Sequence, residues 1–419
     1  MTKEAPMRLS DLCDFAATPV DPRDRPNDVY VGLEHIMPGR FERIGAGTAS
    51  EVQSGKYAFQ PGDVLYGKLR PYLDKAVLAR DAGICTTELL VLRPKAGIDP
   101  RFLVCVVHAP SFVEHAIAGT TGVQHPRTSW NHISNFELPG FTPDEQTAIA
   151  TILWEVHDAL TANEEAIDAG ADLKRAAMQA LFTRGLRGEA QKETEIGPMP
   201  ESWEVVEFGP VRQRLQYGTS THCTYERTEY PVLRIPNIEP GRVKADDLKF
   251  AKLNLTEAQR YRLKDGDLIF IRTNGVIERL GACAVFAGQP EGALFASYLI
   301  RATVDRTRLE PYFAAQFFAS EIGTSIVAGR ATPAADGKYN LNTGTIDSLP
   351  LPLPPTLDEQ REIVAVLDAI DRKIALHQRK RAVLEELFKV LLHKLVTGEI
   401  RVHDLALSAL ASATREAAA

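Results

Sequence analysis

The sequence predicts a mixed α/β (α+β) protein with a duplicated globular domain, whose two copies are joined by two long helices that form an antiparallel coiled coil. Three observations predict this fold class. An ordered set of segments occurs twice, each copy ends in a capped helix start, and the apolar residues after each start repeat at heptad spacing. The chain has 419 residues, 44% hydrophobic and 25% charged, which is enough for two or three domains with cores of their own.

The duplication consists of four pairs of matching segments in the same order. "YVGLEHIMPGRF" (Tyr30–Phe41) recurs as "VLRIPNIEPGRV" (Val232–Val243), and Tyr57–Arg70 recurs as Tyr261–Asn274. "IDPRFL" then matches "LEPYFA", and "TPDEQ" matches "TLDEQ". The offset between the copies grows from 202 to 214, as expected for a duplicated domain with small loop insertions.

The stretch "GDVLYGK" (62–68) has the glycine and lysine spacing of a phosphate-binding loop. Two features argue against that function: Leu69 stands where a hydroxyl would hold Mg²⁺, and the second glycine matches Ile271 in the other copy. Both copies instead keep a Gly-Asp turn before a short apolar run, which predicts a strand. A cation, Lys68 or Arg272, follows each run, and a cation where a strand meets a loop is a candidate binding residue.

The start of each long helix is indicated by capping residues. In the first copy Thr142 is the expected N-cap and Glu145 completes a capping box. In the second copy prolines disfavour helix up to Pro355, Thr356 is the expected cap, and Glu359 completes the box.

Apolar residues downstream of both starts follow alternating steps of four and three, which is the heptad pattern of a coiled coil. A helix of about 40 residues is roughly 60 Å long, more than a compact domain needs, so we expect the two helices to pack against each other. The alternative is that each helix packs only on its own domain. Asn163 and His377 occupy equivalent positions, where a polar residue fixes the register. The predicted seam residues are Ile149, Leu153, Val156, Leu160 and Asn163 in the first helix, and Ile363, Leu367, Ile370, Ile374, His377, Leu384, Phe388 and Leu391 in the second.

Composition excludes several classes of protein. No apolar run has the length of a membrane span or a signal peptide, so we expect a cytoplasmic protein. The five cysteines are scattered, without a C-x-x-C pair, and pairs of histidines seven residues apart lack a third ligand, so no metal site is expected. The net charge is −7, but residues 141–190 hold nine acidic and four basic residues, which leaves the flanking domains near neutral.

The proline-rich entry into an acidic-Glu-Gln helix, as in "LPLPPTLDEQREIVAVLDAIDRKI" (Leu351–Ile374), resembles the specificity (S) subunit of type I restriction-modification systems. "LFKVLLHKLVTGEIR" (Leu387–Arg401), "LPGFTPDEQTAIATIL" (Leu138–Leu153) and "GDVLYGKLRPYLDK" (Gly62–Lys75) carry the same resemblance. It covers nearly the whole chain. Gly170 and the single-proline entry of the first helix depart from the family pattern.

The resemblance implies a DNA-reading subunit without catalytic activity or a cofactor of its own. The implied partners are double-stranded DNA, two methyltransferase subunits that use S-adenosylmethionine, and a nuclease or translocase subunit that uses ATP and Mg²⁺. It implies this division of the chain: 1–141, target recognition domain 1; 142–186, first long helix; 187–202, linker; 203–351, target recognition domain 2; 352–398, second long helix; 399–419, C-terminal tail.

Candidates for DNA contact lie at the strand ends and in the polar loops before each helix entry, since such loops suit close approach to phosphates and base edges. The candidates are Lys68, Arg70, Gln124, Arg127, Arg272, Asn274, Arg330, Lys338 and Tyr339. Two other functions stay open. The chain could be a methyltransferase or nuclease itself, although it lacks an Asn- or Asp-Pro-Pro-aromatic motif, or it could be a coiled-coil scaffold that binds no DNA.

Overall fold

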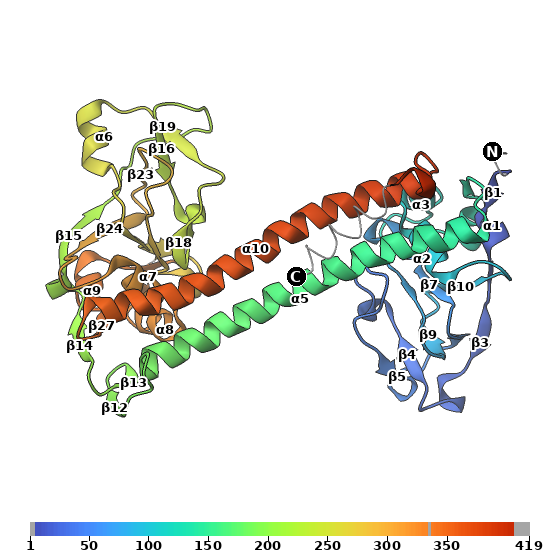
Figure 1. The fold of residues 1–419 in the computed structure, drawn as a ribbon, viewed down its shortest axis with the longest axis horizontal. Coiled ribbons are helices and arrows are strands. Elements are labelled where there is room, and N and C mark those ends of the chain that lie inside the picture. The colour runs from blue at the N-terminus through green and yellow to red at the C-terminus, as the bar shows by residue number, and fades with distance from the viewer. Residues whose placement is uncertain (1–4, 334–336, 406–419) are drawn as a thin grey trace. The chain divides into compact units, whose positions relative to one another are not determined.

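The computed structural model describes residues 5–333 and 337–405 and divides into two compact units (Figure 1). The first unit takes the chain up to Ile167 together with the part from Leu376 onward, and the second takes Asp168–Ala375. Each unit holds one globular domain and a part of both long helices, α5 (Pro143–Arg184) and α10 (Leu357–Val396).

Domain 1 is built on two sheets, with strand orders β2-β10-β7-β8 and β3-β6-β9-β4-β5. Most neighbours are antiparallel, and β4 and β9 are parallel. A separate β1–β11 pair brings the start of the chain beside the segment that leads into α5, and α2 packs on β7 and β8. The elements are β1 (Met7–Arg8), α1 (Leu9–Leu12), β2 (Cys13–Phe15), β3 (Thr18–Val20), β4 (Val29–Val31), β5 (Gly47–Thr48), β6 (Lys56–Phe59), β7 (Val64–Gly67), β8 (Ala76–Leu78), β9 (Gly83–Cys85), β10 (Leu89–Pro94), α2 (Pro100–His108), α3 (Pro110–Ala118), α4 (Trp130–Ile133) and β11 (Glu137–Leu138).

Domain 2 repeats this plan around a larger sheet of order β15-β24-β20-β22-β18-β17, with two three-stranded sheets of orders β19-β16-β23 and β21-β26-β25. Strands β14 and β27 pair at the point where the chain leads into α10. The elements are β14 (Glu204–Glu207), β15 (Arg212–Tyr217), β16 (Tyr230–Leu233), β17 (Ile238–Glu239), β18 (Gly241–Val243), β19 (Lys249–Ala251), α6 (Leu255–Tyr261), β20 (Leu268–Ile271), β21 (Thr273–Asn274), β22 (Cys283–Val285), β23 (Leu294–Phe295), β24 (Leu299–Val304), α7 (Pro311–Ala319), α8 (Glu321–Gly329), β25 (Thr332–Pro333), β26 (Tyr339–Asn340), α9 (Thr343–Asp347) and β27 (Pro350–Leu353).

The Gly-Asp turn before β7 and the one before β20 have the same structure. Gly62 has φ +90° and donates its N–H to the carbonyl of Ala79 at 2.9 Å; Gly266 has φ +81° and donates to Phe286 at 2.8 Å. A positive φ favours glycine, which explains why both copies retain it. The strand that follows is buried in both domains, so the stretch with the phosphate-loop spacing is a core strand.

The first long helix begins with the predicted capping box. Thr142 Oγ1 accepts from the N–H of Glu145 at 3.2 Å, and the Glu145 carboxylate accepts from the N–H of Thr142 at 3.1 Å. At α10, Thr356 Oγ1 accepts from the N–H of Glu359 at 3.2 Å, while the Glu359 carboxylate accepts from the indole of Trp203 at 3.1 Å. That second carboxylate therefore ties the helix start to domain 2.

The two helices run antiparallel within each unit. In the first unit Arg401, just beyond α10, pairs with Glu145 in the first turn of α5 at 3.1 Å, and His377 Nδ1 lies 2.8 Å from Asn163 Oδ1. In the second unit Lys174 Nζ lies 2.7 Å from an oxygen of Asp371. The predicted architecture, duplicated α/β domains with an antiparallel pair of long helices, is confirmed.

In the first unit both helices share one apolar core with domain 1. The five predicted seam residues of α5 are buried, as are Leu384 and Leu391 of α10, and Phe388 is partly buried. Phe41 of domain 1 packs among them, with ring centroids 4.4 Å from His157 and 5.6 Å from Phe388. The helices therefore pack on the domain as well as on each other.

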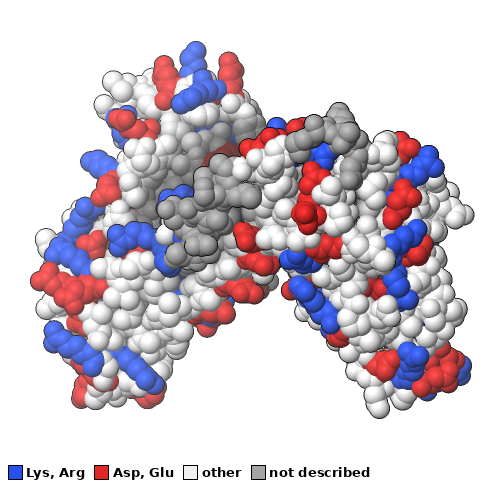
Figure 2. Space-filling model, turned by 45° about the vertical axis from the view of Figure 1, so that its right-hand side comes forward, with Lys and Arg blue, Asp and Glu red and all other residues white. Residues whose placement is uncertain are grey.

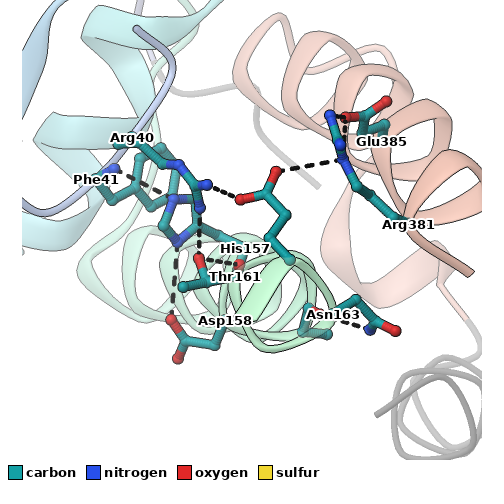
Figure 3. A network of polar contacts seen from close by, with 10 residues as sticks. Arg40, Phe41, His157, Asp158, Thr161, Asn163, Arg381 and Glu385 are labelled. Carbon is teal, nitrogen blue, oxygen red and sulfur yellow. Dashed lines mark hydrogen bonds and ion pairs between the residues drawn. The ribbon is translucent and has the colours of Figure 1, made fainter. Parts of the chain in front are cut away.

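A polar network crosses the same junction (Figure 3). Arg40, beside Phe41, donates to Thr161 Oγ1 at 2.7 Å and forms an ion pair with Glu164. The other Glu164 oxygen lies 3.3 Å from Arg381 on α10, so one carboxylate links the domain to both helices. Burial, then the nearby positive charges of Arg40 and His108, lower the pKa of His157 to about 4, which keeps this imidazole neutral at pH 7.

In the second unit Ile363 and Leu367 of α10 are buried with Met178 and Phe182 of α5 in the core of domain 2. Ile370 and Ile374 are only half-buried, although the heptad pattern predicts them in the seam. Opposite Ile374 lies Gly170, where an added Cβ would come within 2.8 Å of Ile374 Cγ1. Gly170, which departs from the family pattern, therefore leaves the space that the Ile374 side chain occupies.

Several of the predicted segments need correction. The helix expected from 352 begins at Leu357, because 350–353 form β27 against β14 and two prolines follow. The expected linker 187–202 contains a hairpin of β12 (Gln191–Thr194) and β13 (Gly197–Pro200). The first long helix, expected over 142–186, covers 143–184. Of the expected tail 399–419, only the residues up to 405 lie within the described part of the chain, and they include a short 3₁₀ helix over Val402–Asp404.

All five cysteines are unpaired thiols, four of them buried. Within residues 5–333 and 337–405, no group of three His, Cys, Asp or Glu side chains is placed to hold a metal ion. His115 and His132 stack at 4.3 Å, and each ring contacts a backbone carbonyl of the other residue. In the same ranges no single helix is long and apolar enough to cross a membrane; α2 and α3 pass that test only together, as a pair bent by 64°.

Candidate nucleic-acid interface

In domain 1 the structure brings together the four candidate residues Lys68, Arg70, Gln124 and Arg127. They lie on two loops, one after β7 and one before α4, joined by backbone hydrogen bonds. The N–H of Arg70 donates to Pro126 O at 2.7 Å, and the N–H of Thr128 donates to Lys68 O at 3.0 Å. The strand end therefore holds the second loop in place.

Arg70 has a strained backbone at this junction. Its φ of +52° and ψ of +63° lie in the left-handed region, which costs an L-residue roughly 1–2 kcal/mol. The residue caps the 3₁₀ helix η4 (Pro71–Leu73), and its guanidinium donates to Gln124 O at 3.4 Å. Strain of this kind clusters at functional sites, where surrounding contacts maintain it.

Arg127 forms an ion pair with Glu88, which directly precedes β10. Its guanidinium meets Glu88 in a two-point contact, with Nε to Oε2 and Nη2 to Oε1 both at 3.0 Å. The hydrogen bonds from Arg127 lower the pKa of Glu88, so the pair is ionised and its charge cancels near neutral pH. This geometry makes Arg127 a brace for the loop rather than a free cation, and no sequence pattern indicates its partner Glu88.

In domain 2 the candidates Asn274 and Tyr339 lie in the small sheet β21-β26-β25, and Arg272 directly precedes β21. Asn274 pairs with Tyr339 across β21 and β26, and the N–H of Leu341 donates to Arg272 O at 2.7 Å. The Arg272 guanidinium lies over the ring of Tyr217 at 4.8 Å, a cation–π contact that fixes its direction without cancelling its charge. Tyr217 was not among the predicted residues.

Two further candidates lie elsewhere in the same region. Arg330 caps the end of α8 and donates to Ser348 Oγ at 3.1 Å, which places it beside the segment leading into β27. Lys338 is exposed and directly precedes β26. The Asn274 side-chain oxygen accepts from the N–H of Val276 at 3.0 Å, leaving the amide NH₂ as a donor.

The two sites share one backbone frame. In domain 1 the N–H of Lys68 donates to Glu88 O, and in domain 2 the N–H of Arg272 donates to Tyr298 O, both at 3.0 Å. The bond from Thr128 to Lys68 has its equivalent in the bond from Leu341 to Arg272. The frame is repeated while its side chains differ, since Glu88 in one copy stands where Tyr298 stands in the other.

Charge is mixed over the surface. On the face shown in Figure 2, Lys and Arg side chains alternate with Asp and Glu over the described residues of both domains. Mixed charge on this face gives little general attraction to polyanions, which leaves the loop residues as the candidates for a specific contact.

A model of the type I restriction modification DNA specificity domain matches residues 200–386 of the chain. The EcoKI specificity subunit of Escherichia coli is 27% identical over 53% of this chain and 48% of its own length. The MjaVIII specificity subunit of Methanocaldococcus jannaschii is 23% identical over 77% of this chain and 76% of its own length.

Residues 200–386 thus match the type I restriction modification DNA specificity domain, and the chain is similar to type I restriction-modification specificity subunits. It spans about half the length of the curated relatives with higher identity, 48% of EcoKI and 49% of the MjaX protein. Among solved structures, the type I S subunit of M. genitalium covers 94% of this chain with a TM-score of 0.57 and 14% identity. A chain from a type I R-M complex gives a TM-score of 0.55 at 19% identity. These two structural similarities show that the chain has the same fold as those proteins.

Proposed function

We propose that this specificity subunit is the DNA-recognition subunit of a type I restriction-modification complex. Domain 1 and domain 2 each read one part of a split target in double-stranded DNA. The observation that carries the proposal is the repeated frame: the same backbone hydrogen bonds hold a loop with cations and amides at equivalent places in both domains. A protein that binds one continuous site has no need of two such frames.

The side chains on each frame suit the major groove and its phosphates. Lys68 and Arg272 provide cations at the strand ends, where contacts to phosphate oxygens set position. Gln124 and Asn274 carry amides, which pair bidentately with adenine when they face a base edge. Differences between the two sets give each domain its own sequence preference.

The chemistry of modification and cleavage belongs to partner subunits in this proposal. The specificity subunit is not itself an enzyme and acts in the cytoplasm. Two methyltransferase subunits, which use S-adenosylmethionine, dock on surfaces related by the duplication, and a nuclease or translocase subunit uses ATP and Mg²⁺. The burial of β7 supports this assignment, because the chain's one stretch with phosphate-loop spacing is packed into the core of domain 1.

Mapping methylated adenines in the genome with and without this gene tests the proposal. We expect deletion to remove methylation at a single split motif and complementation to restore it. A methylome that does not change would contradict the proposal.

The dependence of DNA binding on salt concentration distinguishes a DNA-reading subunit from a scaffold that binds no DNA. Binding of the assembled complex to its motif should weaken steeply as ionic strength rises, and the preference should persist against competitor DNA. Binding that ignores both sequence and salt would favour a scaffold.

A further inference from the structure

Large apolar side chains are exposed beside the candidate DNA-contact residues in both domains. Tyr72 is 53% exposed and lies two residues after Arg70; Val276 is 50% exposed and lies two residues after Asn274. Arg70 and Asn274 occupy the same position of the repeat. Single exposed apolar residues are common on protein surfaces, so exposure alone is weak evidence. Recurrence at the same distance from a matched polar residue is the stronger observation.

A third such residue stands at the tip of the loop before α4. Val123 is 99% exposed and follows Gly122, which has φ +91°. The loop is closed below it by two reciprocal backbone bonds between Thr121 and Arg127, both 3.0 Å. The ion pair from Arg127 to Glu88 holds the base of this loop against the sheet, so its tip is presented on a braced support.

Val276 is held in a comparable way. Its N–H donates to the Asn274 side chain at 3.0 Å, and its carbonyl accepts from the N–H of Arg279 at 3.1 Å. Because valine is branched at Cβ, its methyl groups keep a nearly fixed direction once the backbone is fixed. Neighbouring cations and amides would place the same loops against the edges of base pairs.

The 5-methyl group of thymine is the apolar group that the major groove exposes beside its hydrogen-bonding atoms. We propose that Tyr72, Val123 and Val276, here called the apolar readers, contact thymine 5-methyl groups. Each half of the split target then contains a T·A pair whose recognition depends on that methyl group. The inference rests on the proposed function, because it assigns a base-edge partner to the same loops.

The test uses the specificity subunit assembled with its methyltransferase subunits and duplexes of the mapped motif in which each thymine in turn is replaced by deoxyuridine. This change removes the methyl group and keeps every hydrogen-bonding atom. We expect at least one position in each half to lose about fourfold in affinity, the equivalent of one buried methyl-sized group.

Three variants show which side chain contacts which thymine. Val276→Ala should abolish the deoxyuridine effect in one half of the motif, and Val123→Ala should reduce it in the other half, with Tyr72→Ala accounting for the remainder. Leu255→Ala in domain 2 and Ile44→Ala in domain 1 are matched controls, because these side chains are 63% and 61% exposed and lie outside the loops described above. Both controls should leave the deoxyuridine pattern unchanged.

The possible outcomes distinguish a failure of methyl reading from a failure of the proposed DNA recognition. A complex with no sequence preference would overturn both. A complex that prefers its motif but shows no deoxyuridine effect, or a motif half that lacks a T·A pair, would overturn the apolar readers alone. Equal losses on thymine and deoxyuridine duplexes in the alanine variants would assign these residues to wedging or backbone contact and would also refute methyl reading.

Discussion

Replacing Gly170 by alanine should destabilise the second unit even though alanine is the better helix former. In the middle of a helix the exchange gains up to about 1 kcal/mol. The new Cβ would lie 2.8 Å from Ile374 Cγ1, well inside the roughly 3.5–4.0 Å at which carbon atoms pack. Overpacking of this kind costs about 1–3 kcal/mol, so the clash should outweigh the gain and leave a net loss of about 1 kcal/mol.

The sign should reverse when Ile374 is also shortened. Ile374→Ala removes the Cγ1 that the new methyl group would meet, so in that background Gly170→Ala should stabilise by up to about 1 kcal/mol. Ala169→Gly, at an exposed position one residue away, measures the helix-propensity part by itself, without a helix–helix contact. Chemical denaturation of the full chain, followed by circular dichroism, gives the free energies of unfolding of the wild type and the four variants, and hydrogen exchange over residues 165–175 gives the local effect.

A stabilising Gly170→Ala in the wild-type background would refute the reasoning, because it would show that the helices do not approach closely here. Equal effects of Gly170→Ala in both backgrounds would refute it as well, since the coupling between the two positions would then be absent.

Three further predictions concern single sites. The pKa of His157 is about 4 in the folded chain and near 6.5 in the unfolded chain. Between these two pH values His157 is protonated in the unfolded chain and neutral in the folded chain. The free energy of unfolding should therefore fall by up to about 3 kcal/mol as pH drops from 6.5 towards 4. His157→Gln should make the free energy of unfolding, measured by denaturation at each pH, depend less steeply on pH. An unchanged dependence would assign the effect to other groups. Glu88→Gln should release Arg127 for phosphate, steepening the salt dependence of DNA binding by up to about 0.9 in the log–log slope, and an unchanged slope would mean that the arginine stays committed. Lys68→Ala and Arg70→Ala should each weaken binding of the assembled complex and lower the same slope by about one, whereas unchanged affinity would remove them from the interface.

The elements that sequence predicted well are those set by local chemistry. The helix starts follow from residues three positions apart, as the hydrogen bonds between Thr142 and Glu145 show. The strand after each Gly-Asp turn follows from a turn that favours glycine and an apolar run. The duplication needed only the order of short matches, which no single segment would have established.

The parts that sequence missed depend on contacts between distant segments. Glu88 meets Arg127 because the end of β7 holds the later loop beside the start of β10, and no local pattern gives that register. Tyr217 meets Arg272 only because β24 lies between β15 and β20 in the sheet. The heptad pattern placed Ile374 in the seam but carried no information on how closely the backbone of the facing helix approaches.

The two copies of the domain share backbone hydrogen bonds more closely than they share side chains. The two frames keep equivalent hydrogen bonds at Lys68 and Arg272, yet the residue that receives the first of them is acidic in domain 1 and aromatic in domain 2. The cations near the two frames make different contacts: Arg127 forms an ion pair with Glu88 in domain 1, and Arg272 lies over the face of Tyr217 in domain 2. Because backbone bonds set the frame, the side chains on it can change without loss of the fold. Two copies of one frame can thus carry different contact residues, as the proposed reading of a split target requires.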